Sequence, residues 1–91
     1  MKSPKNHELR QLRAVIDRLD KAIIAQVAKR LAIAAKIGAL KKRQGAPIRS
    51  PKREALLQKL HAQWSKEFNI SKQTITKVFD LIMEESKRIQ K

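Results

Sequence analysis

The sequence contains no cysteine, only two glycines and three prolines, and no long run of apolar residues. Without cysteine, the chain can form neither disulfides nor thiolate metal sites. Because no apolar run reaches about 18 residues, nothing is predicted to span a membrane. The polar start MKSPKNHE lacks the apolar core of a signal peptide. These absences predict a cytoplasmic protein.

Aromatic and histidine side chains are also few. Trp64, Phe68 and Phe79 fall at positions predicted to be core, which leaves no platform on which nucleic-acid bases could stack. His7 and His61 have no histidine or carboxylate partner at metal-ligand spacing. We therefore expect no metal site.

Acidic side chains are far outnumbered, and the net charge is +14, from 22 Lys and Arg against 8 Asp and Glu. Such a charge predicts an anionic partner, of which nucleic acid is the usual example. The cations are spread along the chain, however, and only residues 41–43 form a tight cluster. A generally basic surface that aids solubility is the simpler interpretation.

Apolar residues recur at three- and four-residue steps from Leu9 to Leu40, which predicts one long helix over residues 8–43. Gly45 then ends this helix. Residues 1–7 are expected to be a disordered tail. The rest of the chain, residues 8–91, is expected to be a single all-α domain.

Two shorter helices are predicted after the long one. Ser50 is a good N-cap and Pro51 suits a first helical position, so the second helix begins there and ends near Asn69. Ser71 is the N-cap of the third, which continues to the C-terminus.

The long helix is too long for a monomer of this size. Roughly 36 residues span about 54 Å, whereas a globule of 91 residues is roughly 30 Å across. About half of its apolar stripe needs a partner, and an intertwined homodimer supplies one. A break near Gly38 that folds the helix back is the alternative.

Polar residues interrupt the apolar stripes of all three predicted helices. They are Arg30 and Lys41 in the first, Arg53 and Glu54 in the second, and Ser86 and Gln90 in the third. Unpaired buried cations cost several kcal/mol each, so this mostly cationic set predicts a compact dianionic ligand enclosed by the helices. No serine is paired with a histidine, so acyl transfer is not expected. Binding alone, or a reaction that needs only orientation and electrostatic stabilisation, remains.

At these positions the chain resembles the small all-helical class of chorismate mutases, from Leu9 to Gln90. Short segments carry the resemblance, in register and with no insertion. They are Arg13 ahead of IDRLD, Arg30 in AKRLAIA, Lys41 in IGALKK, Arg53 and Glu54 in PIRSPKRE, and Ser86 and Gln90 in IMEESKRIQ.

The resemblance implies an intertwined dimer that rearranges chorismate to prephenate without a cofactor or a covalent intermediate. Arg13 from one chain and Arg30 from the other would hold the two carboxylates of the substrate. Lys41 and Gln90 would donate to its ether oxygen, where negative charge grows as the bond breaks.

The remaining roles concern the ring hydroxyl and the second helix. Glu54 would accept from the hydroxyl with Arg53 nearby, and Ser86 would support a carboxylate. Many bacterial members have Asp where this chain has Ser50, so Ser50 is expected to serve mainly as a helix cap. Because helix ends fray, we expect Gln90 to be ordered only with ligand.

Two other functions remain open. The chain also resembles isochorismate pyruvate lyases, which look built on the same scaffold. Those enzymes tend to have an apolar residue where this chain has Glu54, which favours the mutase. A basic helical nucleic-acid-binding protein would explain the charge of +14 but not the polar groups on the apolar stripes.

Overall fold

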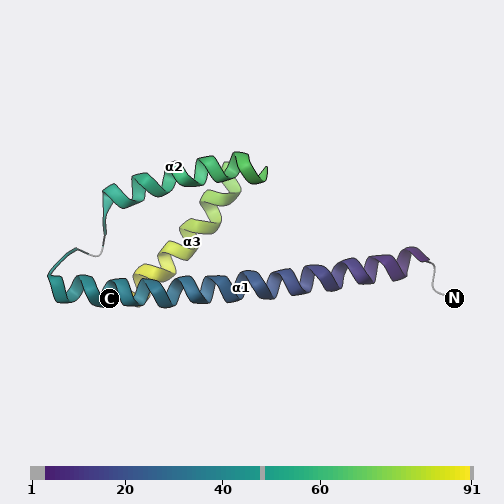
Figure 1. Cartoon of the computed structure of the whole chain (residues 1–91), viewed down its shortest axis with the longest axis horizontal. Coiled ribbons are helices and arrows are strands. Elements are labelled where there is room, and N and C mark those ends of the chain that lie inside the picture. Colours follow the sequence, from purple (N-terminus) through teal and green to yellow (C-terminus); the bar gives the residue numbers. More distant parts are fainter. Residues whose placement is uncertain (1–3, 48, 91) are drawn as a thin grey trace. The chain divides into compact units, whose positions relative to one another are not determined.

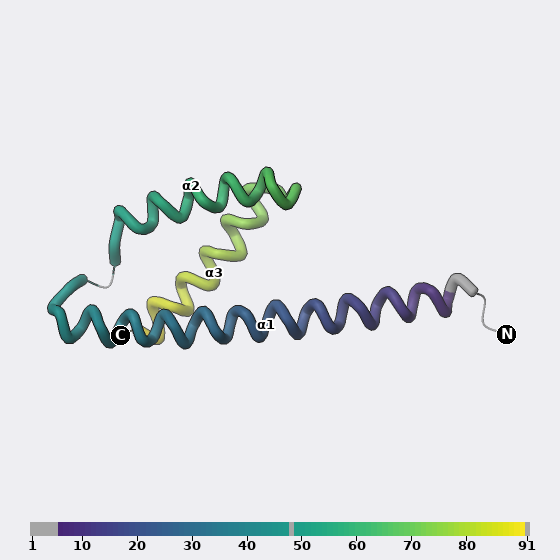
Figure 2. Tube along the Cα trace, in the orientation of Figure 1, coloured from purple at the N-terminus to yellow at the C-terminus, as the bar shows by residue number. Residues whose placement is uncertain are grey.

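The computed structural model describes residues 4–47 and 49–90 of the chain, which form three α-helices (Figure 1). The helices are α1 (Pro4–Gln44), α2 (Pro51–Phe68) and α3 (Lys72–Gln90), and Figure 2 traces the chain through them. The described residues contain no strand, which confirms the predicted all-α class. The chain divides into two units, residues 1–30 and residues 31–91, and each is described by itself.

Helix α1 begins at Pro4, four residues earlier than predicted, so residues 4–7 of the expected disordered tail are helical. Proline is tolerated there because the first N–H groups of a helix lack an intrahelical partner in any case. Residues 1–3 of the expected tail lie outside the described residues. The helix continues through Gly38 rather than breaking there, which excludes the folded-back alternative.

The end of α1 follows from its glycine. Gly45 adopts a φ of 69°, in the left-handed region that glycine enters without strain. The N–H of Ala46 donates to the carbonyl of Lys41 at 2.8 Å, and the N–H of Gly45 donates to that of Lys42 at 3.3 Å. These two bonds are the pattern of a Schellman motif and satisfy carbonyls that the helix would otherwise leave unpaired.

The capping residues of the two shorter helices are those that the sequence predicted. The hydroxyl of Ser50 accepts from the N–H of Arg53 at 3.3 Å, and that of Ser71 accepts from the N–H of Thr74 at 3.1 Å. At the end of α2, Asn69 adopts a φ of 54°, which asparagine tolerates better than most residues.

Helices α2 and α3 pack together within residues 31–91. The buried ring of His61 lies 4.3 Å from that of Phe79 and 5.9 Å from that of Trp64, measured between centroids. Trp64 and Phe68 are nevertheless 41% and 66% exposed, so the prediction that they are core is wrong for the single chain. The periodic pattern marks the face that needs covering and does not say which chain covers it.

Most large apolar side chains of α1 are exposed in the single chain. Between residues 6 and 26 every side chain is exposed, including the large apolar ones of that stretch: Leu9, Leu12, Val15, Ile16, Leu19, Ile23 and Ile24. We call these seven residues the α1 apolar stripe. Among the described residues, no helix has the length and apolar character needed to cross a membrane.

Candidate active site

The end of α3 lies against α1 within residues 31–91. Gly38 is buried, and a Cβ atom placed on it would lie only 2.7 Å from Cγ and 3.3 Å from Cα of Gln90. The absence of a side chain at Gly38 therefore allows Gln90 to approach the backbone of α1. Helix α3 extends through Gln90, and the expectation that this residue is ordered only with ligand stays a prediction.

The side-chain amide of Gln90 has an acceptor atom that makes no hydrogen bond among the described residues. This atom, Oε1, is buried. A buried polar atom without a partner costs about 1–3 kcal/mol, so this position favours a ligand or partner that supplies one. Rotation of the amide exchanges its oxygen and nitrogen, so the same position can present an N–H donor.

Lys41 and Ser86 lie on the elements that carry this contact. Lys41 is half-buried and follows Gly38 by three residues, which places both on the same side of α1. Ser86 is buried, one turn before Gln90 on α3, and its hydroxyl donates to the carbonyl of Ile82 at 2.9 Å. The hydroxyl oxygen keeps lone pairs, and the proton can rotate toward another acceptor.

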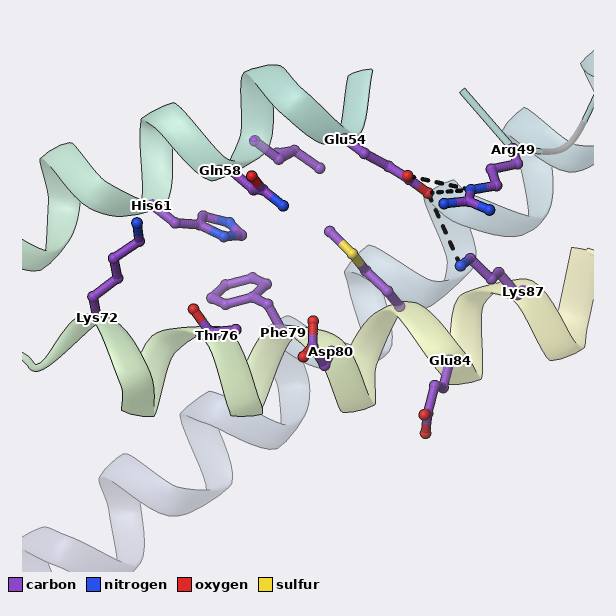
Figure 3. Close-up of a pocket in the computed structure, with 12 residues that line it drawn as sticks. Arg49, Glu54, Gln58, His61, Lys72, Thr76, Phe79, Asp80, Glu84 and Lys87 are labelled. Atoms are coloured by element: carbon purple, nitrogen blue, oxygen red, sulfur yellow. Dashed lines mark hydrogen bonds and ion pairs between the residues drawn. The ribbon is translucent and has the colours of Figure 1, made fainter. Parts of the chain in front are cut away.

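The N-cap and the first turn of α2 together carry three more of the predicted site residues. Ser50 caps the helix, as expected, and Arg53 has an exposed side chain. Glu54 is half-buried and points away from the helix toward α3 (Figure 3).

The partners of Glu54 come from outside its own helix. The Nε atom of Arg49 lies 3.3 Å from each carboxylate oxygen of Glu54, and the Nζ atom of Lys87 lies 4.0 Å from Oε1 (Figure 3). Sequence reasoning assigned no role to Arg49 or Lys87. The only sequence feature that could have indicated Lys87 is its position directly after Ser86, which was a predicted site residue.

Glu54 also borders a groove of about 560 Å³ between α2 and α3 (Figure 3). The groove is lined by Arg49, Glu54, Leu57, Gln58, His61, Lys72, Thr76, Phe79, Asp80, Met83, Glu84 and Lys87. Glu54 alone belongs to the set predicted from the sequence. Within the described part of the chain, no three His, Asp or Glu side chains are grouped so as to hold a metal ion.

The two predicted carboxylate-binding arginines lie in residues 1–30. Arg13 is exposed and Arg30 is half-buried. The other predicted site residues lie in residues 31–91, where the structure brings Gln90 to Gly38, and Glu54 to Lys87, the residue after Ser86.

Residues 12–91 match the family model described as chorismate mutase type II. The chorismate mutase of Methanocaldococcus jannaschii is 30% identical to the chain, over 92% of this chain and 85% of that protein. The 4-amino-4-deoxychorismate mutase of Streptomyces venezuelae is 27% identical, over 92% of this chain and 82% of that protein.

Longer proteins also match. The T-protein of Enterobacter agglomerans is 37% identical over 87% of this chain, which spans only 21% of that protein. No solved structure gives a significant match. The family model covers nearly the whole chain, with the exception of its first residues. The chain therefore belongs to the chorismate mutase type II family.

Proposed function

We propose that the chain is a chorismate mutase that rearranges chorismate to prephenate on the route to phenylalanine and tyrosine. Family membership supports this activity. The observation that carries the assignment of the site is the contact between Gln90 and Gly38. This contact supports the proposal because Gln90, whose Oε1 is buried, lies against the turn of α1 that precedes Lys41. We propose that Lys41 and the amide of Gln90 donate to the same atom of the substrate.

The reaction is an isomerisation in which a C–O ether bond breaks while a C–C bond forms in the same cyclic step. No proton, electron pair or leaving group is lost. Negative charge grows on the ether oxygen, so Lys41 and the N–H of Gln90 would stabilise the transition state more than the substrate. This chemistry needs no nucleophile and fits the predicted absence of a cofactor.

The two carboxylates of chorismate require two fixed cations. Arg30 of one chain and Arg13 of a second chain would bind them, with support from the hydroxyl of Ser86. Arginine is suited to this role because its planar guanidinium can bind a carboxylate with two hydrogen bonds. Holding both ends of the substrate favours the compact conformer in which the reacting carbons approach each other.

The ring hydroxyl would donate to Glu54. Arg53 directly precedes Glu54 in the sequence, and its side chain is exposed. We propose that it lies near the ring hydroxyl of the bound substrate. Ser50 keeps its role as the N-cap of α2.

The activity is tested by following chorismate by ultraviolet absorbance while prephenate and pyruvate are assayed separately, with isochorismate in parallel. Prephenate formation is the expected result. Pyruvate formed from isochorismate, without prephenate from chorismate, would instead identify a lyase. Inactivity toward both substrates would contradict the enzymatic proposal and make salt-dependent nucleic-acid binding the next measurement.

The α1 apolar stripe supports a homodimer. Covering each such side chain gains about 1.5–3 kcal/mol, and a second copy of α1 offers a matching stripe. In light scattering coupled to size exclusion, we expect twice the chain mass of 10.5 kDa. Ile16→Glu should disrupt this dimer because it would bury a charge.

The matched control is Arg18→Glu, which lies about 200° from Ile16 around α1 and should leave the dimer intact. A monomeric wild-type chain with full mutase activity would contradict the proposed dimer. So would an Ile16→Glu variant that keeps the wild-type mass.

Gly38→Ala is expected to lower kcat by about 100-fold. The added Cβ would lie 2.7 Å from Cγ of Gln90, so the end of α3 has to move away from α1. Steady-state kinetics measure the effect. Gly45→Ala is the control, because a Cβ there meets nothing within 4 Å while φ stays positive. It should lose stability but keep its activity, and equal kinetic effects of the two substitutions would contradict the positioning role of Gly38.

A further inference from the structure

The carboxylate of Glu54 is held by cations from two different elements. Arg49 precedes α2 and donates from Nε to both oxygens at 3.3 Å. Lys87 belongs to α3 and lies 4.0 Å from Oε1. Figure 3 shows the two cationic side chains converging on the carboxylate from the same end of the groove. The side chains of these two cations are 71% and 54% exposed, and both contribute positive charge beside the carboxylate of Glu54.

This arrangement leaves room for a hydroxyl donor. A carboxylate offers about four acceptor positions. Arg49 uses a single N–H that is shared between the two oxygens, and Lys87 lies beyond hydrogen-bond distance at 4.0 Å. The side chain of Glu54 is also 32% exposed. A neutral hydroxyl can thus donate to the carboxylate without displacing either cation.

A positively charged donor would meet a different environment. An isolated carboxylate attracts an ammonium group more strongly than a hydroxyl. Here two positive charges already neutralise the carboxylate, and like charges placed together oppose binding. The same site therefore favours a hydroxyl and disfavours an ammonium group at the same ring position.

We propose that Arg49 and Lys87 determine ring-substituent specificity, so that the site selects substrates with a ring hydroxyl over those with a ring amine. The inference rests on the proposed function and on the contact of Glu54 with the ring substituent. The relative from Streptomyces venezuelae, which is named for an amino-substituted chorismate, has 27% identity over most of the chain. The names of the two relatives therefore refer to substrates with different ring substituents.

The test compares kcat/KM for chorismate and for 4-amino-4-deoxychorismate, at a pH low enough for the amine to carry its proton. The variants are Lys87→Met, Arg49→Met and the double variant, each of which keeps most of the side-chain length. Arg88→Met is the control, because Arg88 is the next residue on α3 and pairs with Glu85 instead of Glu54. All variants are made in the full chain.

We expect Lys87→Met to lower the ratio of kcat/KM for chorismate to kcat/KM for the amino substrate by about fivefold. An effect of this size is expected when one partly exposed charge is removed. The double variant should lower it further, and Arg88→Met should leave it unchanged. An unchanged preference in the double variant, with chorismate still converted, would overturn the inference and leave the proposed function standing. A wild-type chain that converts neither substrate would overturn both.

Discussion

A mixture of two strongly impaired variants, Arg13→Ala and Arg30→Ala, is expected to recover about one quarter of wild-type activity. Each variant alone lacks one carboxylate-binding arginine at both sites of the dimer. Loss of such a charge-assisted contact should lower kcat/KM by about 100-fold to 1,000-fold. Mixing therefore raises activity far above that of either component.

The recovery follows from the supply of Arg13 across the interface. In a mixed dimer one site contains both substitutions, and the other contains intact Arg13 and intact Arg30. Random pairing makes about half of the dimers mixed, and half of the sites in those dimers are intact. The measurement is the initial rate of chorismate loss after the two variants are unfolded together and refolded.

A second mixture provides the control. Arg30 and Lys41 are proposed to serve the same site from the same chain, so mixing Arg30→Ala with Lys41→Ala leaves one defect at every site of a mixed dimer. No recovery is expected. Recovery in this control, or its absence in the mixture of Arg13→Ala with Arg30→Ala, would contradict the proposed division of the site between chains.

Lys41→Ala is expected to lower kcat by about 1,000-fold, whereas Lys42→Ala should leave it nearly unchanged. Lys41 is half-buried and lies on the side of α1 that Gln90 contacts. Lys42 is exposed and borders a shallow groove with Lys36 and Arg43. The two variants remove the same charge from adjacent residues, so they separate donation at the ether oxygen from the effect of net charge.

Circular dichroism and thermal unfolding check that both variants keep the wild-type fold. Gln90→Ala should also lower kcat, because its amide is the second proposed donor. Small and equal losses for Lys41→Ala and Lys42→Ala would indicate that these cations act only through general surface charge. In that case the rate should fall with salt in both variants to the same extent.

Local features of the chain were predictable from the sequence because short-range chemistry determines them. The caps at Ser50 and Ser71, and the end of α1 at Gly45, depend on residues within one or two turns. The start of α1 was placed four residues too late, because Pro4 is compatible with either a tail or a first helical turn.

The long-range contacts of the site could not be predicted in the same way. Polar residues on apolar stripes indicated Glu54 and Gln90, but no local pattern sets the register of α3 against α1 and α2. Nothing in the sequence distinguished Arg49 and Lys87 from ordinary surface cations, although both lie beside Glu54 in the structure. Gly38 was considered only as the place of an alternative helix break, and nothing in the sequence indicated that its missing side chain admits Gln90.

The α1 apolar stripe has a consequence for how the chain folds. An isolated helix in water is only marginally stable, and side chains 6–26 are all exposed in the single chain. Ordering of this segment should therefore coincide with the covering of its stripe by a second copy. Refolding should contain a phase whose rate rises with chain concentration, and the midpoint of unfolding should rise with it.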